Sequence, residues 1–254
     1  MELVKTFTGG ATEKGISITD RVSSLGFAIN DDFNDETITV TLKRDGKKDV
    51  VLIPDVKISE LSDFACHGEG TWLRTGGTGT IFGFKAIAFI DLTESGGLPL
   101  GKKDGDEIIV DFAGLTGANT HSLYQAIDDE LAESALVYEK DAVSAPKQLV
   151  SRDVGDYGDA LILPTANFEK IIKHFDGDTP SITDDKIGIQ LDHMRNNDIA
   201  DIVGNATTLN FGVNENFVVS LEDVLKFQVY TTVTTGYNFV KVSMVPLDEE
   251  IETV

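Results

Sequence analysis

The sequence has few residues that crosslink a fold or anchor it in a membrane. Its 254 residues include one cysteine, Cys66, so no disulfide can form within the chain, and the segments around it lack CxxC and histidine partners at zinc-ligand spacing. The longest apolar run, Ile81 to Ile90, is interrupted by Gly83 and Lys85 and has about half the length of a membrane-spanning helix. Residues Met1 to Gly10 contain no basic stretch followed by an apolar one, so no secretory signal is expected. We therefore predict a soluble protein that is made in the cytoplasm and stabilised by core packing.

Positive charge is scarce. Lysine and arginine number 21 against 43 aspartate and glutamate residues, which gives a formal net charge of -22 spread along the whole chain. A field of this sign repels phosphate backbones, so no direct nucleic-acid binding is expected. Two interpretations of the acidity remain open. One is a solvated surface that keeps an abundant protein soluble, and the other is adaptation to salty surroundings in which cations line up with the carboxylates.

The sequence also lacks complete catalytic motifs. Gly77-Thr78-Gly79 begins like a dinucleotide-binding fingerprint, but Phe82 stands where the third glycine is required. The His-x-Glu of a zinc deaminase occurs at residues 67–69, but no Pro-Cys-x-x-Cys follows it. No Gly-x-Ser-x-Gly nucleophile elbow is present. The chain is therefore not expected to be an enzyme or to bind an organic cofactor.

The first half of the sequence predicts β-strands. Residues Thr37 to Lys43 alternate between apolar and polar, Asp45-Gly46 supplies a tight turn, and Val50 to Ile53 returns as the partner strand. Residues Ile108 to Phe112 alternate in the same way. Residues Ile81 to Ile90 carry apolar side chains on both faces, so we expect this strand to be covered on both sides, by its own core and by a neighbouring barrel or subunit.

Three segments show helical spacing instead. Ile58, Leu61 and Phe64 predict one short turn of helix. A longer helix is expected over residues 120–136, capped by Asn119 or Thr120. Another, capped by Asn167, is expected over Phe168 to Phe175. The buried stripe of the helix over residues 120–136 consists of Leu123, Ile127, Leu131 and Ala135.

The second half repeats the strand pattern. Residues 139–146 combine charges, small residues and a proline, so we expect one domain over residues 1–140 and another over residues 141–254. The halves share no close sequence repeat, so any duplication would lie in the fold alone. The strands expected in the second half are Leu161 to Leu163, Ile187 to Leu191, Leu225 to Val233 and Val240 to Met244.

Carboxylates are the one chemical group in surplus. Asp31, Asp32, Asp35 and Glu36 lie together just before a predicted strand. Hard cations such as calcium bind several oxygens from loops of this kind, so these four residues are the candidates for a metal site. The alternative is that they are solvated loop residues, because their spacing does not match that of an EF-hand.

Most of the chain resembles the double jelly-roll major capsid proteins of tailless icosahedral bacteriophages of the corticovirus and tectivirus type. The resemblance is carried by the strands Phe82 to Ile90 and Glu107 to Phe112 on either side of the loop Gly96 to Leu100, by the helix expected over Thr120 to Ala135, and by the strand-helix-strand order from Leu161 onward. It implies an all-β fold with a few short helices, built as two tandem antiparallel jelly-roll barrels.

The resemblance also implies the partners of the chain. Three copies would form a pseudo-hexagonal homotrimer with upright barrels, and the trimers would tile the capsid lattice of a virion. Further partners would be other virion proteins, such as penton or membrane proteins, and a lipid membrane beneath the shell.

Two other functions remain open on the sequence. A tandem β-sandwich of a virion spike or similar surface protein would bind a glycan or a receptor. It would need exposed aromatic residues in loops at one end, for which Trp72, Tyr157 and Tyr237 are the candidates. A hydrolase would need two carboxylates across a cleft, and no motif in the sequence identifies such a pair.

Overall fold

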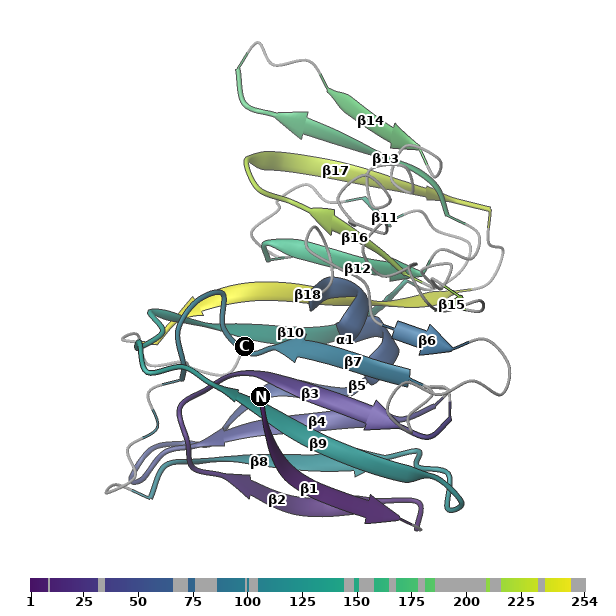
Figure 1. Cartoon of the computed structure of the whole chain (residues 1–254). Coiled ribbons are helices and arrows are strands. Elements are labelled where there is room, and N and C mark those ends of the chain that lie inside the picture. Colours follow the sequence, from purple (N-terminus) through teal and green to yellow (C-terminus); the bar gives the residue numbers. More distant parts are fainter. Residues whose placement is uncertain are drawn as a thin grey trace.

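Two β-barrels lie one above the other in the computed structural model of the chain (Figure 1). The N-terminal half forms the first barrel and the C-terminal half forms the second. The structure describes residues 1–8, 10–31, 35–65, 73–75, 86–98, 100, 105–143, 149–150, 158–164, 168–177, 181–185, 209–210, 216–232 and 236–247.

The first barrel consists of two antiparallel sheets. One has the strand order β1-β9-β3-β7 and is extended at one edge by β6 and β15, and the other has the order β2-β8-β4-β5. A short helix, α1, follows β5. The bounds are β1 Glu2–Thr8, β2 Glu13–Ile18, β3 Val22–Ile29, β4 Thr37–Lys43, β5 Val50–Lys57, α1 Ile58–Ala65, β6 Leu73–Thr75, β7 Ala86–Asp91, β8 Glu107–Ala113 and β9 Thr120–Ile127.

The second barrel repeats this construction. Its sheets have the orders β10-β18-β12-β16 and β11-β17-β13-β14, while β15, which lies between β14 and β16 in the sequence, pairs with β6 of the first barrel. The bounds are β10 Ser134–Val143, β11 Leu149–Val150, β12 Ala160–Pro164, β13 Phe168–Phe175, β14 Ile182–Asp185, β15 Leu209–Asn210, β16 Asn216–Ser220, β17 Val224–Thr231 and β18 Tyr237–Pro246.

The two barrels share one topology although their sequences differ. Within the described residues and without β6 and β15, each barrel has eight strands, and counting them in chain order gives the sheet orders 1-8-3-6 and 2-7-4-5 in both barrels. Two four-stranded antiparallel sheets connected in this way form a jelly roll. The predicted fold class, two tandem antiparallel jelly-roll barrels, is therefore confirmed.

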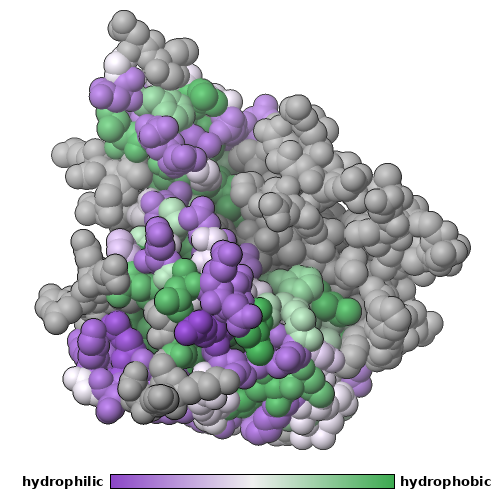
Figure 2. All heavy atoms as spheres, turned by 60° about the vertical axis from the view of Figure 1, so that its left-hand side comes forward, coloured by the Kyte–Doolittle hydropathy of each residue, from purple (hydrophilic) through white to green (hydrophobic). Residues whose placement is uncertain are grey.

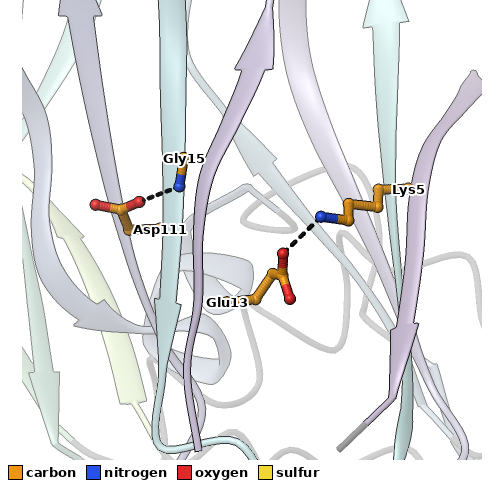
Figure 3. Close-up of polar contacts among 4 residues, drawn as sticks. All are labelled: Lys5, Glu13, Gly15 and Asp111. Carbon is orange, nitrogen blue, oxygen red and sulfur yellow. Dashed lines mark hydrogen bonds and ion pairs between the residues drawn. The ribbon is translucent and has the colours of Figure 1, made fainter. Parts of the chain in front are cut away.

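Two polar contacts hold β2 in the first barrel (Figure 3). Lys5 of β1 pairs with Glu13 of β2, with 2.5 Å between Nζ and Oε1, where the edges of the two sheets meet. The ladder between β2 and β8 is irregular between Glu13 and Ile16, and the Gly15 amide donates to Oδ1 of Asp111 at 2.7 Å. Gly15 has a φ of +70°, which glycine adopts readily because it lacks a Cβ. A bulge with a side-chain acceptor therefore satisfies the amide that leaves the ladder.

The hydrophobic core continues from the first barrel into the second. Leu161, Phe227 and Phe239 belong to the interior of the second barrel. Tyr138 of β10 and Ile162 of β12 instead join the core of the first barrel. Because successive side chains of a strand point to opposite faces, β12 is buried on both sides, by a different core on each.

Several predicted elements are confirmed. β4 and β5 form the hairpin around Asp45-Gly46, and α1 lies where the short helix was expected. β8, β12 and β18 coincide with predicted strands, and β17 covers the predicted strand as far as Thr231. The strand expected over Ile187 to Leu191 lies outside the described residues.

The two longer predicted helices are wrong. Residues Thr120–Ile127 and Ser134–Val143 form β9 and β10, so the helix expected over residues 120–136 is instead two strands and the connection between them. Residues Phe168–Phe175 form β13. The order from Leu161 onward therefore begins strand-strand instead of strand-helix-strand.

The strand expected to be covered on both sides is fully buried on one side and partly exposed on the other. In its described part, β7, Ala88 and Ile90 are fully buried whereas Phe89 on the opposite face is 39% exposed. Residues 81–85 lie outside the described residues. A subunit that covers Phe89 therefore remains a prediction.

Candidate assembly surfaces

The two barrels meet at a buried junction. The outer face of the β10-β18-β12-β16 sheet, which points away from the interior of the second barrel, packs against the first barrel, where β10 contacts β5 and α1 contacts β12 and β16. Burial of such a face stabilises by about 25 cal/mol per Å² of apolar surface. The side chains of β10, β12 and β18 that join the first barrel's core are Ala135, Leu136, Tyr138, Ala160, Ile162, Val240 and Val242.

Tyr138 is the largest side chain at this junction. It is 1% exposed, and its hydroxyl donates a hydrogen bond of 2.8 Å to the backbone carbonyl oxygen of Asp91, at the end of β7. Burial raises the pKa of Tyr138 well above its usual value of 10.0, and the nearby Asp91 carboxylate raises it further. A buried tyrosine needs a partner for its hydroxyl, so this hydrogen bond fixes where β10 sits on the first barrel.

The connection between the barrels, residues 128–133, is pinned to the loop after β7. The Gly97 amide donates to the Glu130 carbonyl at 2.8 Å, and the Ala132 amide donates to the Gly97 carbonyl at 2.9 Å. A Cβ at Gly97 would lie 2.7 Å from the carbonyl oxygens of Arg21 and Asp128, so the backbones approach more closely than a side chain permits. The last strand of the first barrel ends at Ile127, and the first strand of the second barrel begins at Ser134. Residue 140, after which the domain boundary was expected, lies inside β10.

The first barrel has a face equivalent to the one that is covered in the second, and in this chain Met1, Leu3 and Phe89 are exposed on it, whereas Gly26 is buried and Tyr124 is half-buried. Strand pairing aligns Leu3 of β1 with Tyr124 of β9, Tyr124 with Gly26 of β3, and Gly26 with Phe89 of β7. The Met1 side chain lies over Gly26, where a Cβ would come within 2.8 Å of its sulfur. Met1 and Leu3 are 59% and 58% exposed. We call these five residues, Met1, Leu3, Gly26, Phe89 and Tyr124, the open face.

Hydrophobic residues are visible on the surface of the molecule. Figure 2 shows green groups of them among hydrophilic residues on the lower part, where the first barrel lies. Single exposed apolar side chains are normal, but several on one sheet face indicate an interaction surface. The open face is such a group, because its members lie in one row across β1, β9, β3 and β7.

Two of the four predicted metal ligands, Asp35 and Glu36, lie in different surroundings. The Asp35 side chain is exposed and pairs with Lys57, with 3.0 Å between Oδ1 and Nζ, whereas Glu36 is 2% exposed and points into the first barrel. Asp31 is half-buried, and Asp32 lies outside the described residues. Among the residues that the structure describes, no group of three or more His, Cys, Asp or Glu side chains is arranged to hold a metal ion. Calcium binding at Asp31, Asp32, Asp35 and Glu36 therefore remains an untested expectation.

Glu36 faces a histidine that sequence reasoning did not associate with it. Its Oε1 lies 3.8 Å from Nε2 of His121 on β9, and both side chains are buried. The His121 ring also stacks on Phe7, with 5.4 Å between ring centroids. An acidic and a basic side chain are therefore enclosed together in the first barrel. The sequence gives little indication of this contact, because Glu36 and His121 are far apart along the chain.

The second barrel has a hollow of about 580 Å³ at the end of β13. Phe175 is its one aromatic lining residue among acidic and aliphatic ones, which does not resemble the aromatic platform that a glycan-binding module requires. Tyr237, a candidate for such a platform, is half-buried beside Phe239. The hollow is lined by Phe175, Asp176, Glu222, Asp223, Val224 and Leu225.

Other residues singled out in the sequence lie outside the described part of the chain. These are Cys66, the His67-Gly68-Glu69 segment, Trp72 and Tyr157. Within the described residues, no helix has the length and apolar character needed to cross a membrane.

Of the two assembly surfaces, the sequence predicted part of the open face but did not predict the junction between the barrels. The alternation of Ile87 and Phe89 with alanines predicted a second contact for β7, which is where the open face lies. The sequence did not predict the junction, because the helix expected over residues 120–136 includes the start of β10. Four consecutive apolar residues, Ala135 to Tyr138, are typical of a strand that is buried on both faces.

Comparison with known proteins agrees with this architecture. No family model and no curated protein matches the sequence. Among solved structures, the chain is similar to the crystal structure of the major capsid protein P2 from bacteriophage PM2, with a TM-score of 0.58 and 9% sequence identity. The match covers 98% of this chain and 96% of that one. At this identity the likeness concerns the fold: this chain has the double jelly-roll fold of a bacteriophage major capsid protein, as the sequence predicted.

Proposed function

We propose that this chain is the major capsid protein of a tailless icosahedral virus and that three copies form a pseudo-hexagonal unit that tiles the virion shell. The observation that carries the proposal is the repeated barrel. Two jelly rolls of equal strand order stack with the outer face of one sheet against the neighbouring barrel. Three such chains supply six similar barrels, which is the number that a hexagonal tile needs. The likeness to a major capsid protein over 98% of the chain supports the same function.

The surface of the chain is consistent with a structural role. Jelly rolls keep most strand edges paired or short, which limits aggregation of an abundant β-protein. The net charge of -22 keeps free subunits soluble and disfavours direct contact with nucleic acid. The solved neighbour is a structural protein, in line with the expectation that this chain is not an enzyme. Other virion proteins and an underlying membrane are partners that this function would bring.

Divalent cations between subunits are a separate part of the proposal. Carboxylates that face one another across a subunit boundary repel, and a bound cation such as calcium removes that repulsion. Exposed carboxylates such as Asp35 would contribute to such contacts. Particles treated with a chelator should then dissociate, whereas particles treated with an equal concentration of monovalent salt should not. Particles that stay intact after the chelator would remove cations from the proposal.

The proposed function is tested by the assembly state of the purified chain. Light scattering after size exclusion should give three times the chain mass of 27.5 kDa, and negative-stain images should show hexagonal outlines that pack edge to edge. A chain that stays monomeric at all concentrations and binds a glycan or a receptor would instead support the surface-binding module. That outcome would overturn the capsid function.

A further inference from the structure

The chain contains one docked barrel pair and one docking face that is not used within the chain. In the second barrel, the outer face of β10-β18-β12-β16 is buried by β5 and α1 of the first barrel. The equivalent sheet of the first barrel, β1-β9-β3-β7, has the same strand order, but its outer face carries the open face, where Met1, Leu3 and Phe89 are exposed. The same kind of surface thus occurs twice, once covered and once uncovered.

The two faces correspond strand by strand. In the covered sheet, Tyr138 pairs with Val242, Val242 with Ala160, and Ala160 with Ser220. In the open sheet, the strands in the same positions carry Leu3, Tyr124, Gly26 and Phe89. Each row combines an aromatic residue, an aliphatic residue and a small residue on the third strand. The open face therefore has both the position and the composition of a face that receives a barrel.

The barrel side that covers such a face is known from the junction. It is the side of the first barrel that carries β5, the fifth strand, and the α1 helix that follows it. In the second barrel the fifth strand is β14, an edge strand of its sheet. The first residue of β14, Ile182, is 46% exposed. Its neighbour Asp184 is paired with Lys173, with 3.1 Å between Oδ2 and Nζ, which reduces the charge that would enter a contact.

We propose that the open face of one copy binds the β14 side of the second barrel of another copy, and so repeats between chains the junction that exists within each chain. The contact joins two different surfaces, so it is heterologous, and three successive contacts close a ring. The inference rests on the proposed shell function, and it specifies which surfaces of neighbouring copies are in contact. It identifies Phe89 and Leu3 on one partner and Ile182 on the other as apolar contact residues.

Two charge-introducing variants test the two surfaces separately. Phe89→Asp damages the open face and leaves β14 intact, and Ile182→Asp does the reverse. Leu225→Asp is the matched control, because Leu225 is 54% exposed on β17, which lies inside its sheet between β11 and β13. All three variants add one negative charge. Far-ultraviolet circular dichroism and thermal unfolding establish that each variant is folded, and Leu3→Asp replaces Phe89→Asp if the latter is not.

The expected results are specific to a heterologous contact. Phe89→Asp and Ile182→Asp should each weaken association about 30-fold or more and give monomers in light scattering, whereas Leu225→Asp should assemble like the unmodified chain. An equimolar mixture of Phe89→Asp and Ile182→Asp keeps one undamaged pair of surfaces. It should therefore form a complex of twice the chain mass and nothing larger.

Other outcomes overturn the inference in distinguishable ways. If the unmodified chain assembles and Phe89→Asp assembles equally well, the open face is not the contact, and the shell function stands. If Ile182→Asp alone forms dimers that Phe89→Asp cannot form, two open faces bind each other, and the heterologous contact is wrong. If the unmodified chain is monomeric at every concentration, the proposed function fails together with the contact.

Discussion

The β1-β9-β3-β7 and β10-β18-β12-β16 sheets have the same strand order and different surroundings. On their inner faces both contribute apolar side chains to a barrel core. On the outer face, the second sheet is apolar where the first barrel covers it, whereas the first sheet mixes Leu3 and Phe89 with polar residues such as Thr6 and Ser122, whose hydroxyl oxygens lie 3.0 Å apart. Strand order therefore does not determine what a face binds. The side chains on the outer positions do.

The largest expected effect is a difference in the free energy of unfolding between variants of the covered face and variants of the open face. Tyr138→Ala removes a fully buried ring and the hydrogen bond to Asp91, so we expect a loss of about 3–5 kcal/mol in the free energy of unfolding. Leu3→Ala at the corresponding strand position should change it by less than about 0.5 kcal/mol, because Leu3 is exposed in the monomer. Urea denaturation followed by circular dichroism, below the concentration at which the chain associates, measures both values.

Equal losses for the two variants would contradict the comparison. They would mean that Leu3 is buried in the free chain, or that Tyr138 does not hold the barrels together. Lys140→Ala, on the same strand as Tyr138 but with a half-exposed side chain, controls for a general effect of changing β10.

The interiors of the two barrels differ as well. Among the described residues, the first barrel encloses Glu36 with His121, whereas the buried polar side chain of the second barrel is that of Asn216. Removing one member of a buried pair leaves the other in a low-dielectric site, so His121→Ala should cost about 3 kcal/mol. Glu36→Gln in the same chain should recover part of that loss. A double-mutant cycle by urea denaturation gives the coupling, and strictly additive effects would show that the two side chains act independently.

Alkaline pH should weaken the junction through Tyr138. Its pKa in the folded chain lies above the value of about 10 that it has when unfolded, so the unfolded state loses this proton first as the pH rises. The stabilisation that comes from this raised pKa is complete below about pH 10 and is lost above it.

The variant Tyr138→Phe tests this pH dependence. It should cost about 1 kcal/mol at neutral pH and should show a smaller loss of stability above pH 10 than the unmodified chain. Burial lowers the pKa of Lys241, but its hydrogen bond to Glu139 and the charges of Glu139 and Asp141 raise this pKa above its usual value. Because Lys241 is present in both proteins, its effect on stability cancels when the two curves are compared. Parallel alkaline curves for the two proteins would contradict this role of Tyr138.

The errors in predicting secondary structure have identifiable causes. In β13, the ladder is irregular between Phe168 and Lys170, so Phe168 and Ile171 both face the core although they stand three residues apart. A bulge thus converts the two-residue period of a strand into a spacing that is typical of a helix. In β9, the inward positions on either side of Leu123 are His121 and Gln125, so the apolar alternation of a buried strand is missing. The order of apolar and polar residues along the sequence cannot reveal the bulge or the buried polar residues, because both depend on the tertiary contacts of the strand.

The sequence was more informative about architecture than about surfaces. The hairpin of β4 and β5 and the alternation in β8 were predicted because each strand has one apolar face and an ordinary turn. The pairing of Glu36 with His121 was not predicted, because no local sequence pattern indicates it. The start of β4 and the start of β9 come together only through the strand connections of the jelly roll. The open face was predicted in part, through Phe89, and its other members became visible once the register placed them in one row.

The smallest expected effect concerns the one ion pair described between β5 and β10. Asp55 has a φ of +49° at an irregular point of the β4–β5 ladder, which turns its carboxylate outward, where Oδ2 lies 3.6 Å from Nζ of Lys140. Both side chains are at least 43% exposed, so water and salt screen the attraction. Lys140→Ala should therefore lower the free energy of unfolding by a few tenths of a kcal/mol, and 0.5 M salt should abolish the difference. Urea denaturation at low and high salt measures it. A loss comparable to that of Tyr138→Ala would mean that charge, and not the buried apolar face, holds the barrels together.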